Sequence, residues 1–154
     1  MRIEYINPFV EAAFDILKEV LHTEVKRGQL YLKKLGESMK GVAMVIGVTG
    51  QVNGRIVFDM TEDVAVKLAS AMNGENFTAL DKMVMSTMGE LANMITGRAV
   101  TRLEKENLAF HFTPPTMITG KDLSVFEQGD MEALIIPVET GLGMIEINVA
   151  FKEA

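Results

Sequence analysis

The chain of 154 residues has the usual length of one domain, and its 48% hydrophobic and 23% charged content is typical of a globular fold. It has no cysteine and two histidines, which excludes disulfides, thiolate metal sites and a cysteine nucleophile and disfavours a histidine-rich metal centre. A net charge of −6 disfavours nucleic acid as a partner, and no signal peptide or membrane-spanning run is evident, so we expect one cytoplasmic domain over residues 1–154.

The first half of the chain predicts one helix and three strands. The helix runs from Asn7-Pro8, a capping residue followed by proline at the first helical position, to about His22. The strands lie at about 25–35, 42–49 and 54–60, and the continuous apolar run of the second indicates a central strand. Turn residues separate the second strand from the third, so we expect the three to form an antiparallel meander.

Two further helices are predicted next. The first is capped by Thr61 and stops at Asn73-Gly74. The second runs from Thr78 to about Glu106, a length of about 43 Å at 1.5 Å per residue, with Asn107 as its stop. The expected buried face of the first of these two helices carries Val64, Leu68, Ala71 and Met72.

The last third of the chain predicts strands. Two lie at 132–139 and 143–151, a short one is possible near 110–113, and Pro137 suits an edge or a bulge. The proline-rich segment 113–116 is expected to be a rigid connector. Because helices and strands do not alternate regularly, we predict an α+β fold, with an antiparallel sheet and its helices packed on one side.

The predicted long helix carries two different faces. One is an apolar core stripe of Val84, Met88, Leu91, Ile95, Ala99 and Leu103. The other brings together Ser86, Glu90, Asn93 and Gly97, which follow one another at steps of four, three and four. Gly89 and Gly97 each cost about 1 kcal/mol against alanine inside a helix, so we expect a surface kept low for the close approach of another backbone.

The spacing of Glu90 and Asn93 is by itself weak evidence. Glu-x-x-Asn occurs three times, as Glu4/Asn7, Glu90/Asn93 and Glu104/Asn107, and the first and last are expected at helix ends, where asparagine caps. The middle pair lies within a helix, where asparagine has no local structural role. From spacing alone, a purely structural interpretation of this pair stays open.

Ser86-x-x-x-Glu90-x-x-Asn93, followed by Thr113-Pro114-Pro115-Thr116, resembles the motif of the CheC/CheX/FliY family of chemotaxis phosphatases. Segments 89–97 and 120–123, and the run 45–50 ahead of Gly54, resemble the family at similar spacing over most of the chain, and the CheX branch is the most similar. The resemblance implies a CheC-like, pseudo-duplicated fold with one long central helix.

The resemblance also implies an activity, the dephosphorylation of the aspartyl phosphate of a CheY-type response regulator. Asn93 would position the attacking water, and Glu90 would pair with a lysine of the partner. Ser86, Gly89 and Gly97 would contribute to partner binding. We expect no cofactor or metal on this chain, and Mg²⁺ on the response regulator.

Members of this family carry one or two copies of the motif. At the matching place in the first helix Glu11 is present, but Phe14 replaces the asparagine, so we expect one site. The resemblance further implies a homodimer in which two sheets join. The alternating run Met144–Val149, without proline and with one acid, would offer an edge for that pairing.

Two other functions remain open at this stage. One is a non-catalytic binding module, related to CheC-like or flagellar-switch proteins, which would bind a partner without hydrolysis. The other is a small-molecule sensor, for which the sequence shows no pocket residues. Binding without turnover, or binding unaffected by Asn93→Ala, would favour the binding module.

Overall fold

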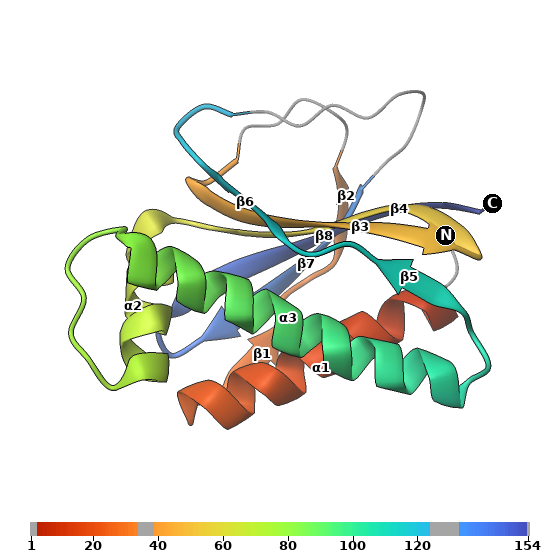
Figure 1. Cartoon of the computed structure of the whole chain (residues 1–154), viewed down its shortest axis with the longest axis horizontal. Coiled ribbons are helices and arrows are strands. Elements are labelled where there is room, and N and C mark those ends of the chain that lie inside the picture. The colour runs from red at the N-terminus through yellow and green to blue at the C-terminus, as the bar shows by residue number, and fades with distance from the viewer. Residues whose placement is uncertain (1–2, 34–38, 124–132, 154) are drawn as a thin grey trace.

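The computed structural model describes residues 3–33, 39–123 and 133–153, which form an eight-stranded antiparallel sheet and three helices. All three helices lie against the same face of the sheet (Figure 1). This arrangement confirms the predicted α+β fold with helices on one side.

The strands of the sheet come from both halves of the chain. Their order is β1-β7-β8-β4-β3-β5, with β2 also paired to β7 and β6 also paired to β3. The bounds are β1 Val25–Arg27, β2 Tyr31–Lys33, β3 Val42–Gly50, β4 Val52–Met60, β5 Phe110–Phe112, β6 Thr116–Thr119, β7 Ala133–Thr140 and β8 Gly143–Glu153. The sequence predicts the short strand β5 but not β6, whose first residue, Thr116, belongs to the predicted proline-rich connector.

The predicted meander is only partly correct. Strands β3 and β4 do form a hairpin, and β3 is interior as expected. The first predicted strand is instead two short strands, β1 and β2, which pair with β7 near the end of the chain; residues 34 and 35 lie outside the described part. The break between them faces Pro137, whose carbonyl accepts a hydrogen bond from the Gly28 N–H at 2.9 Å. Proline has no N–H to donate in the opposite direction, so the strand that pairs with β7 is divided into β1 and β2 at this point.

The prediction that Met144–Val149 forms a free sheet edge was wrong. This run lies in β8, which pairs with β4 on one side and β7 on the other. Its polar residues Glu146 and Asn148 are buried on the face away from the helices. The Lys40 ammonium lies 3.4 Å from the Glu146 carboxylate, and the Tyr31 hydroxyl donates to it at 3.1 Å. The alternation therefore reflects a strand covered on both faces.

Helix α1 spans Ile3–Leu21, so its predicted start at Asn7 was wrong. Pro8 lies inside the helix, where it removes one backbone hydrogen bond. Tyr5 and Ile6, before the proline, are both buried in the core, and this packing favours helix on both sides of it. No described helix is both long and apolar enough to cross a membrane.

Helix α2 spans Glu62–Asn73 and has the predicted ends. The Thr61 hydroxyl accepts the N–H of Val64 at 3.3 Å, and Gly74 closes the helix in the left-handed conformation. Its buried face differs from the prediction, because Ala71 is exposed and Met72 is half-buried. The buried residues of α2 are Val64, Ala65, Leu68 and Ala69.

Helix α3, the long helix, spans Lys82–Lys105 and is about 36 Å long at 1.5 Å per residue. It begins four residues later than predicted, because Asp81 rather than Thr78 caps it: the Asp81 carboxylate accepts the N–H of Val84 at 2.9 Å. All six residues of the predicted core stripe are at most 1% exposed. That stripe faces inward, which turns the opposite side of α3 to solvent.

The end of α3 confirms Asn107 as the stop. Asn107 adopts a φ of 59°, its N–H donates to the Glu104 carbonyl at 3.1 Å, and the Leu108 N–H donates to the Leu103 carbonyl at 2.9 Å. These are the bonds of a Schellman motif, which satisfies the last carbonyls of a helix. Asn107 therefore has a structural role.

Candidate functional site

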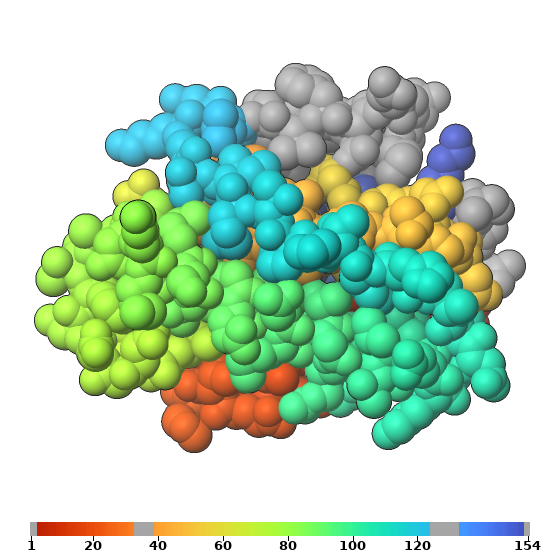
Figure 2. Space-filling model, in the orientation of Figure 1, coloured from red at the N-terminus to blue at the C-terminus, as the bar shows by residue number. Residues whose placement is uncertain are grey.

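The predicted polar stripe of α3 lies on the exposed side of the helix. Ser86, Glu90, Asn93 and Gly97 are exposed, and Gly89 beside them is half-buried. Glu90 and Asn93 are one turn apart, about 4.5 Å along the helix axis. Figure 2 shows the green surface of α3 crossing the front of the molecule, between α1 below and β5 and β6 above.

The three polar side chains of this stripe are not engaged within the described part of the chain. Ser86, Glu90 and Asn93 make no side-chain hydrogen bond or ion pair there. Other polar residues of α3 do: the Thr96 hydroxyl donates to the Ala92 carbonyl at 2.8 Å, and Arg98 binds a carboxylate of α1. The hydroxyl, carboxylate and amide of the stripe are thus available to a partner.

Packing inside the chain requires neither Gly97 of the stripe nor Gly89 beside it. A Cβ built on Gly89 or Gly97 meets no neighbouring atom within 4 Å in the described structure. Both residues have ordinary helical backbone, so alanine would suit the helix better. Their presence therefore favours the predicted function of keeping this surface low.

Gly97→Ala is expected to stabilise the protein and weaken partner binding at once. Helix propensity should raise the free energy of unfolding by about 1 kcal/mol, or the melting temperature by about 2–4 °C. The added methyl should raise the half-saturating partner concentration several-fold, because it holds the partner's backbone away. Thermal unfolding and steady-state rates of the dephosphorylation expected from the resemblance measure the two effects. Unchanged half-saturation would show that close approach at Gly97 is not needed.

Ion pairs hold α3 against α1 beside this stripe. Arg98 binds the Glu19 carboxylate through two bonds of 3.0 Å, while Arg102 binds both Glu11 and Asp15. The hydrogen bond from Arg98 lowers the pKa of Glu19, and the same bond raises the pKa of Arg98. These ion pairs are not predicted from the sequence, although the steps of four along both helices, Glu11, Asp15 and Glu19 on α1 and Arg98 and Arg102 on α3, are a signal for them.

The corresponding place in α1 does not repeat the site. Glu11, the glutamate of the second motif position, is bound by Arg102 at 2.5 Å. Phe14 is half-buried and packs against the core. Here the glutamate is engaged and no amide stands beside it, which agrees with the expectation of one site.

The two other Glu-x-x-Asn pairs have different surroundings. Glu104/Asn107 ends α3, where Asn107 caps the helix. Glu4/Asn7 lies within α1 rather than across its start, and Glu4 has an interaction of its own. Of the three pairs, Glu90/Asn93 therefore combines exposure, two unengaged side chains and neighbouring glycines.

Within the described residues, no three histidine, aspartate or glutamate side chains are grouped so as to hold a metal ion.

Comparison with known proteins identifies a family that this chain matches. The family model described as "Chemotaxis phosphatase CheX" matches residues 42–139, a range that contains all of α3. The CheY-P phosphatase CheX of Thermotoga maritima is 30% identical over 139 residues, covering 90% of each chain.

Two solved structures are similar over almost the whole chain. One is the complex of CheX with CheY, BeF3 and Mg²⁺ from Borrelia burgdorferi, with 35% identity, a TM-score of 0.83, and coverage of 99% of this chain and 100% of that one. The other is a CheC-like superfamily protein from Shewanella, with 29% identity, a TM-score of 0.88 and 99% coverage of both chains. The chain therefore belongs to the CheX family of chemotaxis phosphatases.

Proposed function

We propose that this chain dephosphorylates the aspartyl phosphate of a CheY-type response regulator, and that Asn93 and Glu90 are its catalytic residues. The observation that carries the assignment of the two residues is their position on α3: adjacent, exposed and unengaged within the described part of the chain. Family membership and the named activity of the Thermotoga relative support the reaction. The cytoplasmic location expected from the sequence is part of the same proposal.

Asn93 acts by positioning water. Its amide oxygen accepts a hydrogen bond from the water, and its NH₂ group donates one toward the phosphoryl group. The water oxygen then attacks phosphorus in line with the bond to the aspartyl oxygen; that bond breaks, which yields phosphate and a free carboxylate. Phosphoryl transfer depends mainly on positioning and charge stabilisation, so this chain need not supply a nucleophile.

Glu90 acts on the partner. Its carboxylate, one turn before Asn93, forms an ion pair with a lysine near the phosphoryl group of the response regulator. That contact sets the register in which the two proteins meet. The Mg²⁺ of the proposed reaction would be bound by the response regulator; the Borrelia complex, which contains CheY and Mg²⁺, supports such an arrangement.

The proposal is tested by adding the protein to a phosphorylated CheY-type partner from the same genome, in the presence of Mg²⁺. We expect the lifetime of the phosphorylated partner to shorten in proportion to the protein added. The partner alone and the partner with Asn93→Ala are the controls. An unchanged lifetime contradicts the proposal, and binding without turnover would favour the non-catalytic binding module.

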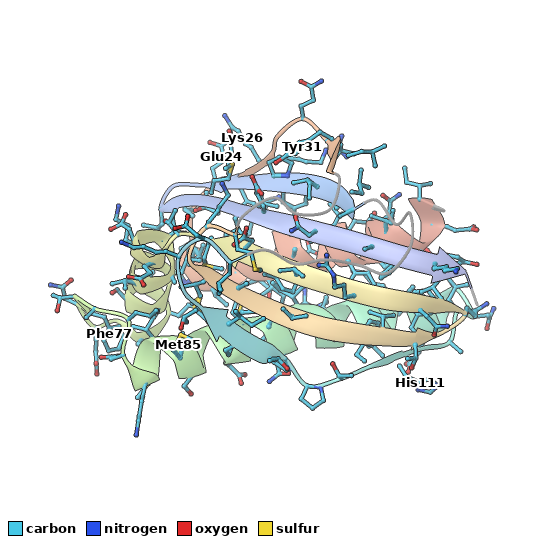
Figure 3. The ribbon with its side chains drawn as sticks, turned by 90° about the horizontal axis from the view of Figure 1, so that it is seen from above. Glu24, Lys26, Tyr31, Phe77, Met85 and His111 are labelled. Atoms are coloured by element: carbon cyan, nitrogen blue, oxygen red, sulfur yellow. The ribbon has the colours of Figure 1, made fainter. Side chains whose placement is uncertain are left out.

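We further propose that two copies form a homodimer through the sheet edge at β2. Leu30, Tyr31 and Leu32 are 36%, 42% and 63% exposed, an unusual run of apolar side chains beside an edge strand. Figure 3 shows Tyr31 at one edge of the sheet and His111 at the opposite edge. In this proposal β2 joins the sheets of the two subunits, because the run Met144–Val149 lies between β4 and β7 and has no free edge.

Leu32→Glu is expected to convert the dimer into a monomer, because a charged side chain at the β2 edge would be buried without a partner on pairing. Light scattering at micromolar concentration measures the mass. Ile3→Glu, at an apolar residue of α1 that is 68% exposed, is the matched control and should remain dimeric. A wild-type mass of one chain would rule out the dimer, and a dimeric Leu32→Glu would place its interface elsewhere.

A further inference from the structure

A groove lies where α3 ends and β5 begins. It has a volume of about 670 Å³, and most of its lining residues are apolar. Val100, Leu108 and Phe112 are half-buried and form its walls, while the buried Leu103 and Phe110 lie beneath them. Leu103 and Leu108 are joined by the backbone bond of the Schellman motif, and Phe110 is held in β5. Because its floor is built from hydrogen-bonded backbone and core side chains, the groove is formed before any partner arrives.

The groove continues the exposed face that carries the candidate site. From Asn93, steps of four, three and four residues lead to Gly97, Val100 and Glu104, which therefore lie on the same side of α3. Gly97 and Glu104 are exposed and Val100 is half-buried. Gly97 has no side chain, and a Cβ built on it meets no atom within 4 Å, so the surface at this step between Asn93 and Val100 is low.

A partner bound at the candidate site would be large enough to contact the groove as well. A standard interface covers about 800 Å² on each protein, equivalent to a disc of about 16 Å radius. Val100 lies about 10.5 Å from Asn93 along the helix axis, and Glu104 about 16.5 Å. A response regulator centred on Asn93 with an interface of this size would cover Val100 and reach the groove.

We propose that this groove binds an apolar side chain of the response regulator and thereby helps select the partner; the proposal rests on the function proposed above. The apolar walls determine the chemistry of that side chain, aliphatic or aromatic. Glu104, exposed on the rim, favours a basic residue next to it on the partner. Asn93 would then act on the phosphoryl group, Glu90 would bind the lysine beside it, and the groove would contribute affinity for one regulator over another.

Two groove variants test this. Val100→Glu places a charge on the wall, and Ala109→Glu places one at an exposed lining residue where loss of folding is not expected. In each we expect the half-saturating concentration of phosphorylated partner to rise about tenfold, with the maximal rate unchanged. Val66→Glu, at a half-buried valine of α2, is the matched control for Val100→Glu and should leave half-saturation unchanged.

The outcomes separate this inference from the proposed function. If both groove variants keep the wild-type half-saturation while Asn93→Ala loses turnover, the groove is rejected and the function stands. If Asn93→Ala keeps full turnover, the catalytic assignment fails instead. If Val66→Glu raises half-saturation as much as Val100→Glu does, while Ala109→Glu has no effect, added charge or lost stability explains the result and the groove is rejected.

Discussion

Asn93→Ala is expected to lower the maximal dephosphorylation rate about 100-fold or more, which corresponds to about 2.7 kcal/mol of transition-state stabilisation. The substitution removes the amide that positions water and leaves the rest of the exposed stripe in place. The defect should persist at saturating partner, because it affects the chemical step rather than binding. Single-turnover measurements with excess protein test this directly.

The stability of the same variant distinguishes loss of catalysis from loss of folding. Asn93 is exposed and makes no side-chain bond with the described residues, and alanine has the higher helix propensity. The melting temperature should therefore hold or rise slightly while activity falls. Asn76→Ala, at an exposed loop asparagine, is the matched control and should keep wild-type turnover. Full activity of Asn93→Ala would remove Asn93 from the mechanism.

Glu90→Ala is expected to raise the half-saturating partner concentration about 30-fold, or about 2 kcal/mol, because the partner's lysine loses its carboxylate. Unlike the Asn93 defect, this one should shrink as the partner concentration rises. Glu90→Gln keeps the shape of the side chain without its charge and should show a defect of similar size. Titration of turnover against partner concentration measures both.

Two controls make the Glu90 result specific. Glu75→Ala removes an exposed carboxylate from the loop after α2 and should leave half-saturation unchanged. Lowering the ionic strength should strengthen wild-type binding more than binding of the Glu90 variants, because the ion pair is screened by salt. A Glu90→Ala defect that stays constant at saturating partner would mean that Glu90 acts in the chemical step.

The sequence predicted the site-bearing helix well because its information is local. The 3.6-residue period separated the core stripe of α3 from the stripe of Ser86, Glu90, Asn93 and Gly97, and the structure buries the first and exposes the second. The end of α3 at Asn107 was likewise predicted by a residue that tolerates the left-handed conformation. The start was misplaced, because Thr78 and Asp81 are both good caps and local sequence does not choose between them.

Pairing between distant strands could not be predicted in this way. An alternating run such as Met144–Val149 has the same period whether its strand is at an edge or between two neighbours. The sequence therefore predicts β8 as a strand but gives it the wrong place, an edge instead of the interior of the sheet. The pairing of β1 with β7 joins segments more than 100 residues apart, and the sequence of β1 alone does not identify its neighbour. Strand order depends on which surfaces the helices and other strands leave to be covered.

The sequence by itself determined the caps of α2 and the two faces of α3, because neighbours along a helix are set by its period. The choice of Glu90 and Asn93 as candidate site residues came from the resemblance to the family motif, since their spacing alone left a structural interpretation open. The tertiary structure alone decided that α1 continues through Pro8, that Arg102 binds Glu11, and that a groove adjoins the stripe beyond Gly97. Each of these depends on surfaces brought together from distant parts of the chain. Their free energy comes from burial and charge pairing between elements, which local propensity does not encode.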